Sequence, residues 1–159
     1  MVILDYSFDP EELKKLEVFD FEKLTGTDLD YHLFCGSIFL RANGISFDAS
    51  WKWIPIFDFC VRMNKVVAQL QNQKQVVLEF TENEATIVFE RENSFVRLKG
   101  QYANADAQVL LQELKEAVRS FSCKLVRELI EKWPMLLDSA AFQERLQIVR
   151  ASFGEVWTL

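Results

Sequence analysis

Residues 75–100, QVVLEFTENEATIVFERENSFVRLKG, constrain the fold more than any other part of the chain. Three short runs alternate apolar and polar side chains, and neighbouring side chains of a β-strand point to opposite faces of the sheet. The alternation therefore predicts a meander of three antiparallel strands with a single apolar face. That face consists of Val76, Leu78, Phe80, Ile87, Phe89, Val96 and Leu98.

Two tight loops set the register that we expect for this meander. A two-residue loop at Asn83-Glu84 pairs Phe80 with Ile87, and a second at Glu92-Asn93 continues the same face into the third strand. A slip of one residue would turn every bulky apolar side chain to the other face, so the pattern specifies the register strongly. The other face carries charges and three scattered apolar residues, and an exposed apolar patch often marks a contact. This outer face is a candidate homodimer surface, with Val77, Val88 and Phe95 as its apolar residues.

A hairpin precedes the meander. Asn43-Gly44 is the strongest short signal for a hairpin turn, and it joins a strand-like run that starts near Tyr31 to the return segment 45–49. Gly36 inside the first run predicts a β-bulge or the close approach of another element. Hairpin and meander together predict about five antiparallel strands.

Helices are expected on either side of the meander. Apolar residues recur at helical spacing from Pro55 to Leu70 and again over residues 105–133, where Pro134 ends the pattern. Asp138 or Ser139 then begins a last helix, which completes a C-terminal helical hairpin. We expect these helices to cover the apolar face of the sheet.

The N-terminal segment 1–30 is acidic. Residues 1–8 predict an edge strand or an extended lead-in, and Asp9-Pro10 begins a short helix that ends near Leu16. The chain shows no linker and no internal repeat, so we expect one α+β domain over residues 1–159.

The distribution of charge along the chain indicates which class of partner to expect. The whole net charge of −6 lies in residues 1–30, which hold nine acids and three bases, whereas residues 31–159 hold equal numbers of each sign. A chain without a basic stripe is not expected to bind nucleic acid. The acidic segment instead favours a basic protein partner. The alternative is a solvated acidic face that serves solubility alone.

Cysteine and hydropathy patterns predict a cytoplasmic protein. No apolar run has the length of a membrane span, and the N-terminus lacks the basic region of a secretory signal. Three widely spaced cysteines and a single histidine, without a CxxC motif, predict free thiols in a reducing compartment and neither a metal nor a cofactor.

The sequence gives little support for catalysis. It contains no phosphate loop, no HExxH and no GxSxG motif, and any histidine chemistry would depend on His32, which is expected on a strand. Asp58 is an acid within an apolar run, and a buried carboxylate there would be a candidate site. Arg62 lies four residues further on, which favours an exposed helical ion pair instead. We therefore expect a protein that is not an enzyme.

Aromatic residues gather between the hairpin and the predicted helix. Trp51 and Trp53, followed by Phe57 and Phe59, line either a ligand pocket or a partner-binding patch, or they belong to the core where the helix docks on the sheet. Three C-terminal residues pose the same alternative of exposed or docked side chains: Phe153, Val156 and Trp157.

These patterns favour a non-enzymatic protein-interaction domain, of the regulatory type or of the type of a bacterial immunity protein, that binds a basic partner. A small-molecule-binding domain with an aromatic pocket between sheet and helix is the alternative. The candidate contact residues are Asp9, Glu11, Glu12, Asp28, Asp30, Trp51, Trp53 and Asp58.

Overall fold

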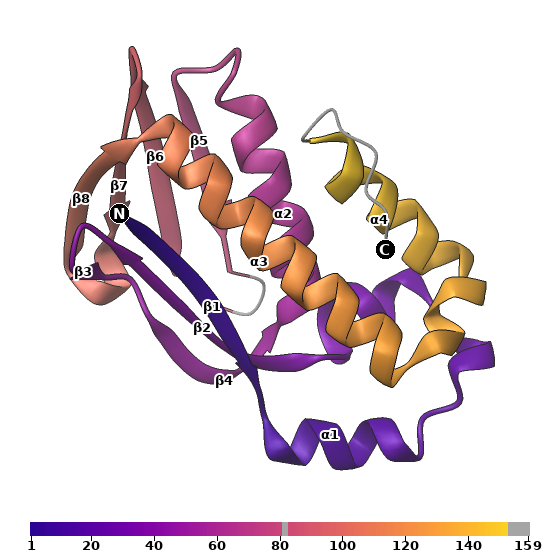
Figure 1. The fold of residues 1–159 in the computed structure, drawn as a ribbon. Coiled ribbons are helices and arrows are strands. Elements are labelled where there is room, and N and C mark those ends of the chain that lie inside the picture. The colour runs from indigo at the N-terminus through magenta and orange to yellow at the C-terminus, as the bar shows by residue number, and fades with distance from the viewer. Residues whose placement is uncertain (81–82, 153–159) are drawn as a thin grey trace.

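The computed structural model describes residues 1–80 and 83–152. Over these residues the chain has the expected α+β class, with two four-stranded antiparallel sheets and four α-helices (Figure 1). The C-terminal residues Phe153, Val156 and Trp157, whose exposure was left open above, lie outside the described residues. No helix in the described part of the chain combines the length and the hydropathy that a membrane span needs.

The first sheet contains the predicted hairpin. It consists of β1 (Val2–Phe8), β2 (Cys35–Ala42), β3 (Ile45–Ser46) and β4 (Ala49–Pro55), with β2 in the middle. The hairpin prediction is confirmed, because Ala42 pairs with Ile45 and both turn residues, Asn43 and Gly44, have the positive φ that such a turn requires. The N-terminal strand is confirmed as an edge strand. The segment with the two tryptophans continues the sheet as β4.

Gly36 fulfils both parts of its prediction. The register of β2 against β4 shifts between Gly36 and Ile38, which is a bulge. On the other side, a Cβ atom at Gly36 would lie 2.0 Å from the carbonyl oxygen of Ser7 on β1. Only a residue without a side chain lets these two strands approach so closely.

The meander forms most of the second sheet. This sheet runs in the order β5 (Gln75–Glu79), β6 (Thr86–Glu92), β7 (Phe95–Gly100) and β8 (Ala105–Leu110). The expected register is wrong by two residues, because Leu78 pairs with Ile87 and the second turn lies at Asn93-Ser94, where Asn93 adopts a positive φ of 56°. A shift of two residues preserves the face. The predicted apolar face is therefore confirmed: Val76, Leu78, Phe80, Ile87, Phe89, Val96 and Leu98 are all buried.

The outer face of this sheet is exposed and carries cross-strand ion pairs. Arg97 binds Asp106 at 2.6 Å, and Lys99 lies 3.3 Å from Glu90. Val77 and Phe95 are exposed at opposite sides of these charges. Dimerisation through this face stays a prediction.

Strand β8 corrects the predicted long helix. Residues 105–110 were expected at the start of that helix, but they pair with β7, and Ala105, Ala107 and Val109 alternate into the core. Two of these three residues are alanines, which carry little periodic signal in either direction. Helix α3 (Leu111–Lys132) follows and is continuous.

The remaining helical elements frame the sheets. The segment α1 (Pro10–Glu17) begins after Asp9 as predicted, although the Asp9 side chain makes no cap hydrogen bond. The short helices η1 (Phe21–Lys23) and η2 (Asp28–His32) follow. Tyr31 and His32 therefore lie in a helical turn, and the expectation of a strand there is wrong. The other elements are α2 (Ile56–Gln69), η3 (Gln101–Ala103), η4 (Pro134–Asp138) and α4 (Ala140–Ala151).

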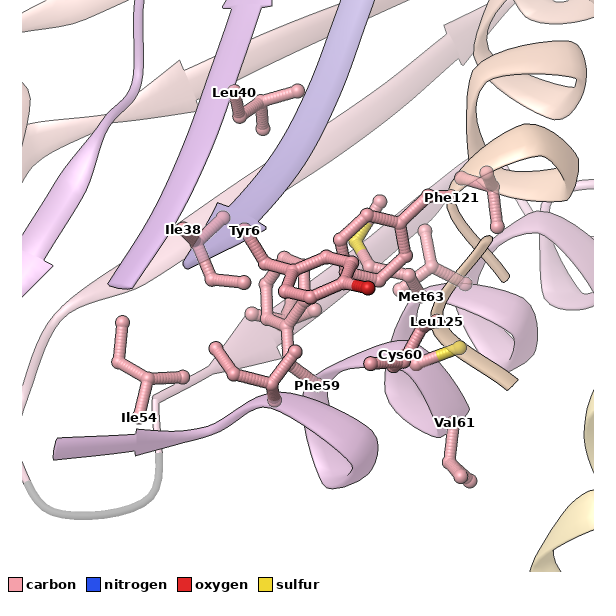
Figure 2. Close-up of a cluster of buried hydrophobic side chains, with 14 of the residues drawn as sticks. Tyr6, Ile38, Leu40, Ile54, Phe59, Cys60, Val61, Met63, Phe121 and Leu125 are labelled. Carbon is pink, nitrogen blue, oxygen red and sulfur yellow. The ribbon is translucent and has the colours of Figure 1, made fainter. Parts of the chain in front are cut away.

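Helix α2 is the centre of the core. It contacts strands of both sheets, and α3 and α4 both pack against it (Figure 1). Figure 2 shows side chains from both sides of this contact. The ring of Phe121 on α3 makes T-shaped contacts with Tyr6 on β1 and Phe59 on α2, with ring centroids 5.5 and 6.0 Å apart. Helix α4 docks through Phe142, whose ring stacks on Phe57 at 4.9 Å. Helices α3 and α4 are thus the C-terminal pair of helices, and α4 packs mainly against α2.

A buried polar network fixes these three helices. Asn64 on α2 donates to Ser122 Oγ on α3 at 2.9 Å and accepts from Ser152 Oγ at 2.6 Å. Cys60 contacts the same Ser122 at 3.3 Å, and burial raises the pKa of its thiol to about 12. Such satisfied networks specify one packing arrangement. The three cysteines form no disulfide.

Candidate binding cleft

A wide hollow lies between the N-terminal segment and the start of the last helix. Its volume is about 850 Å³. One wall is formed by residues 19–24 around η1, and the other by residues 135–141, where η4 leads into α4. The lining consists of Phe19, Asp20, Phe21, Glu22, Leu24, Met135, Asp138, Ser139, Ala140 and Ala141. We call this hollow the acid-rimmed cleft.

A chain of aromatic rings lies beneath the cleft. Phe19 meets Phe21 edge to face at 5.2 Å, and Phe21 lies 6.5 Å from the buried Phe34. Phe34 in turn packs on Trp133 at 5.2 Å, just before Pro134 opens η4. Aromatic contacts of this kind stabilise by about 0.5–1.5 kcal/mol each beyond the area they bury. The rings thus connect η1 with the residue that precedes η4.

An ion pair joins the elements that follow the two walls in the chain. Arg145 on α4 donates from Nε and Nη2 to the two carboxylate oxygens of Asp30 on η2, at 2.8 and 2.9 Å. A Cβ atom at Gly26 would lie 2.6 Å from Arg145 Nη2, so the guanidinium lies directly against the backbone of the N-terminal segment. The paired carboxylate raises the pKa of Arg145 further. Bidentate geometry fixes the guanidinium in orientation as well as in position.

The rim of the cleft is acidic. Asp20, Glu22 and Asp138 line it, and none of its ten lining residues is a lysine or an arginine. Lys23 approaches Asp20 at 3.9 Å from an exposed position. Apolar surface is open beside the acids, because Met135 is 44% exposed. The cleft thus offers an apolar floor with negative charge around it.

A second hollow of about 450 Å³ contains two of the predicted residues, Asp30 and Asp58. The predicted pair of Asp58 with Arg62 is confirmed, with Nε 2.8 Å from Oδ2. The pair is half-buried and not fully exposed, since the side chain of Asp58 is 10% exposed and that of Arg62 is 34% exposed. Burial raises the pKa of Asp58 to about 6; Arg62 opposes this rise, and the negative charge of Asp30 adds to it. The remaining charges in the lining, Lys65, Glu144 and Arg145, leave the hollow electrically balanced.

The other predicted acids do not form one binding surface. Glu11 lies near Lys14 at 3.6 Å on the exposed side of α1, and Asp9 precedes that helix. Asp28 accepts from the backbone N–H and the hydroxyl of Thr25. Glu12 was expected to be exposed but is buried, with Lys15 at 3.7 Å. The reason is its helical position four residues before the buried Leu16, on the inner side of α1.

The predicted aromatic residues pack against the core. The rings of Trp51 and Trp53 stack with their centroids 5.2 Å apart, and Lys52 between them has a positive φ. Trp51 also meets the edges of Phe80 and Tyr102 at 5.0 and 5.3 Å. Both tryptophans are half-buried, whereas Phe57 and Phe59 are fully enclosed.

Sequence reasoning missed the acid-rimmed cleft. None of the eight candidate residues lines it. The available signal was the run Phe19-Asp20-Phe21-Glu22, in which aromatic residues alternate with acids outside any regular strand. Its other wall, at residues 135–141, carries no distinctive motif.

Signs of catalytic or metal chemistry are few in the described residues. His32 is exposed, and its carbonyl oxygen accepts from Lys15 Nζ at 2.6 Å. Residues 1–80 and 83–152 contain no group of three histidine, cysteine or acidic side chains that could hold a metal ion. Comparison with known protein families, characterised proteins and solved structures gives no match to this chain.

Proposed function

We propose that this protein is a non-enzymatic interaction domain that binds a basic segment of a partner protein in the acid-rimmed cleft. The supporting observation is the combination of an aromatic floor with three acids and no base in its lining. A partner segment with one large apolar residue between lysines or arginines would complement both features.

The two features have different roles in binding. Burial of the partner's apolar side chain against Phe19, Phe21 and Met135 would supply most of the affinity, as buried anchors do at other interfaces. The acids would speed the encounter and select for a basic partner. The net charge of −6 adds long-range attraction of the same sign. Regulatory binding and toxin neutralisation by an immunity-type protein both fit this mode of action, and the identity of the partner separates them.

The test is affinity capture at low salt with three forms of the protein. The cleft variant is Asp20→Asn/Glu22→Gln/Asp138→Asn, and Asn at position 20 keeps the acceptor for the backbone N–H of Glu22. The control variant is Glu84→Gln/Glu92→Gln/Glu116→Gln, which removes the same charge from exposed positions on other elements.

A captured protein supports the proposal if it is basic, binds the wild type and the control variant, and does not bind the cleft variant. Its affinity for the wild type falls as salt is raised. The proposal fails if every captured protein binds the cleft variant as well as the control variant, or if no basic protein is captured at low salt.

A small-molecule role is the second candidate, because about 850 Å³ lies within the usual range of ligand pockets. The same lining would suit an organic cation with an aromatic or aliphatic body. A thermal-shift screen of such cations tests this role, since a ligand that binds only the native state raises its stability. A ligand that stabilises the wild type and not the cleft variant would support it; no shift across the screen would exclude it.

A further inference from the structure

Strand β5 is an open edge of the second sheet. It pairs with β6 on one side, and its other side faces α2 (Figure 1). The opposite edge of the sheet is covered, because Asn43 in the hairpin turn donates to the carbonyl oxygen of Gln108 on β8 at 2.6 Å. The two ends of the sheet therefore differ in how they are protected.

The backbone of β5 presents unpaired groups along this edge. Just beyond its two ends, Phe80 N–H donates to the carbonyl oxygen of Ala85, and the carbonyl oxygen of Lys74 accepts from Arg91 N–H. The backbone groups of both Lys74 and Phe80 therefore point towards the chain of β6. Backbone groups alternate in direction along a strand, so the even-numbered residues face β6. The N–H and C=O groups of Gln75 and Val77 consequently point outward.

Arg62 shows that these outward groups accept hydrogen bonds. Its Nη1 atom donates to the carbonyl oxygen of Glu79 at 2.8 Å, at the far end of the same edge. This carbonyl belongs to the odd-numbered set, as the alternation requires. The side chain of Arg62 thus occupies the outward carbonyl group of Glu79. The outward backbone groups of Gln75 and Val77 remain for another strand.

A narrow groove of about 130 Å³ runs between β5 and α2. Its floor is apolar, with Val66, Val76 and Leu78, and Val77 at its border is 46% exposed. The sequence of β5, QVVLE, contains neither the proline nor the lysine that often protects a sheet edge, and its register to β6 has no bulge. The edge is therefore suited to the addition of a strand.

Charge identifies the kind of strand. Arg62 and Lys65 on α2 and Glu79 on β5 line the groove. Arg62 is already paired with Asp58, whereas Lys65 is exposed, so the cation that is open to a partner here is Lys65. An acidic side chain on a partner strand would lie beside it.

We propose that the β5 edge binds an extended, acid-containing segment of a partner protein by β-strand addition. Its backbone pairs with Gln75 and Val77, an apolar side chain enters the groove over Val66 and Leu78, and a carboxylate pairs with Lys65. This site shares no lining residue with the acid-rimmed cleft and prefers the opposite charge.

Selection from a phage-displayed library of random peptides tests the proposal. Peptides that bind are expected to alternate apolar and polar residues and to carry acids. Val77→Pro removes an outward N–H without breaking the ladder to β6, and should weaken their binding about tenfold or more, as should Lys65→Glu. The cleft variant Asp20→Asn/Glu22→Gln/Asp138→Asn should bind them as the wild type does, which separates this site from the proposed function.

Hydrogen exchange of the wild-type protein gives a readout that does not depend on a variant. The amides of Gln75 and Val77 should exchange rapidly in the free protein and slowly with a selected peptide bound, while those of Val76 and Leu78 stay slow throughout. The proposal is overturned if no acidic peptide is enriched, if the selected peptides bind Val77→Pro and Lys65→Glu unchanged, or if the Val77 amide is already protected in the free protein.

Discussion

Arg145 and Asp30 join the two ends of the chain across 115 residues of sequence through two hydrogen bonds of 2.8 and 2.9 Å. The pair is half-buried, with side-chain exposures of 17% for Arg145 and 31% for Asp30. It holds η2 against α4, the elements that follow the two walls of the acid-rimmed cleft in the chain.

A double-mutant cycle measures the strength of this tether. Asp30→Asn and Arg145→Gln should each lower the free energy of unfolding, and the double variant should lose less than the sum, with a coupling of about 1–2 kcal/mol. Urea unfolding of the four proteins gives the value. Additive losses would show that the two side chains do not stabilise each other.

Gly26→Ala tests the same contact from the backbone side. The new Cβ atom would lie 2.6 Å from Arg145 Nη2, so the guanidinium has to move away from Asp30. We expect a loss of stability close to that of Arg145→Gln, and little further loss when Gly26→Ala is added to Arg145→Gln. An equal loss in both backgrounds would mean that the alanine acts through something other than Arg145.

Asp58 predicts a pH dependence with a definite sign. Its pKa is raised from 3.8 to about 6, so between these pH values the folded protein binds a proton that the unfolded chain does not. The contribution of Asp58 to stability is therefore largest below pH 4 and is lost as the pH rises towards 6. Asp58→Asn should stabilise the protein at pH 7 by about 1–2 kcal/mol and flatten this part of the profile.

Urea unfolding across this pH range, with Glu17→Gln as an exposed control, checks the effect of Asp58→Asn. The control removes the same charge and should change stability little at any pH. A loss of stability in Asp58→Asn at pH 7 would show that the pair with Arg62 outweighs the cost of burial.

Gly36→Ala should be among the most damaging single substitutions in the first sheet. The added Cβ atom meets the backbone of Ser7 at 2.0 Å, and neither strand can move without breaking the pairing of β1 with β2. We expect a loss of about 3 kcal/mol or more, or failure to fold. Gly44→Asn is the control, because Gly44 has open space around it and asparagine tolerates its positive φ. Equal stability of the two variants in thermal unfolding would contradict this account.

Local patterns in the sequence predicted a large part of the fold. The alternation at residues 75–100, the turn at Asn43-Gly44 and the helical spacing after Pro55 each specify an element within a few residues, and all three elements are present. The register error of the meander did not change which side chains are buried, because it equals one full period of the strand. Strand β8 was missed because alanines at positions 105 and 107 suit a helix as well as a strand.

The site could not be predicted in the same way. The acid-rimmed cleft depends on the contact of Asp30 with Arg145 and of Phe34 with Trp133, and neither pair leaves a periodic signal. Charge counting found the acidic segment correctly, but it could not show that Glu12 turns inward or that Asp28 binds Thr25. Which acids remain available is decided by tertiary packing.

An NMR titration of isotope-labelled protein with a synthetic amphipathic peptide of lysine and leucine tests whether the acid-rimmed cleft binds a basic segment. We expect chemical-shift changes to gather at residues 19–24 and 135–141, to weaken with added salt, and to disappear in Asp20→Asn/Glu22→Gln/Asp138→Asn but not in Glu84→Gln/Glu92→Gln/Glu116→Gln. Shifts scattered over the other acids of the N-terminal segment, or unchanged in the cleft variant, would contradict this expectation.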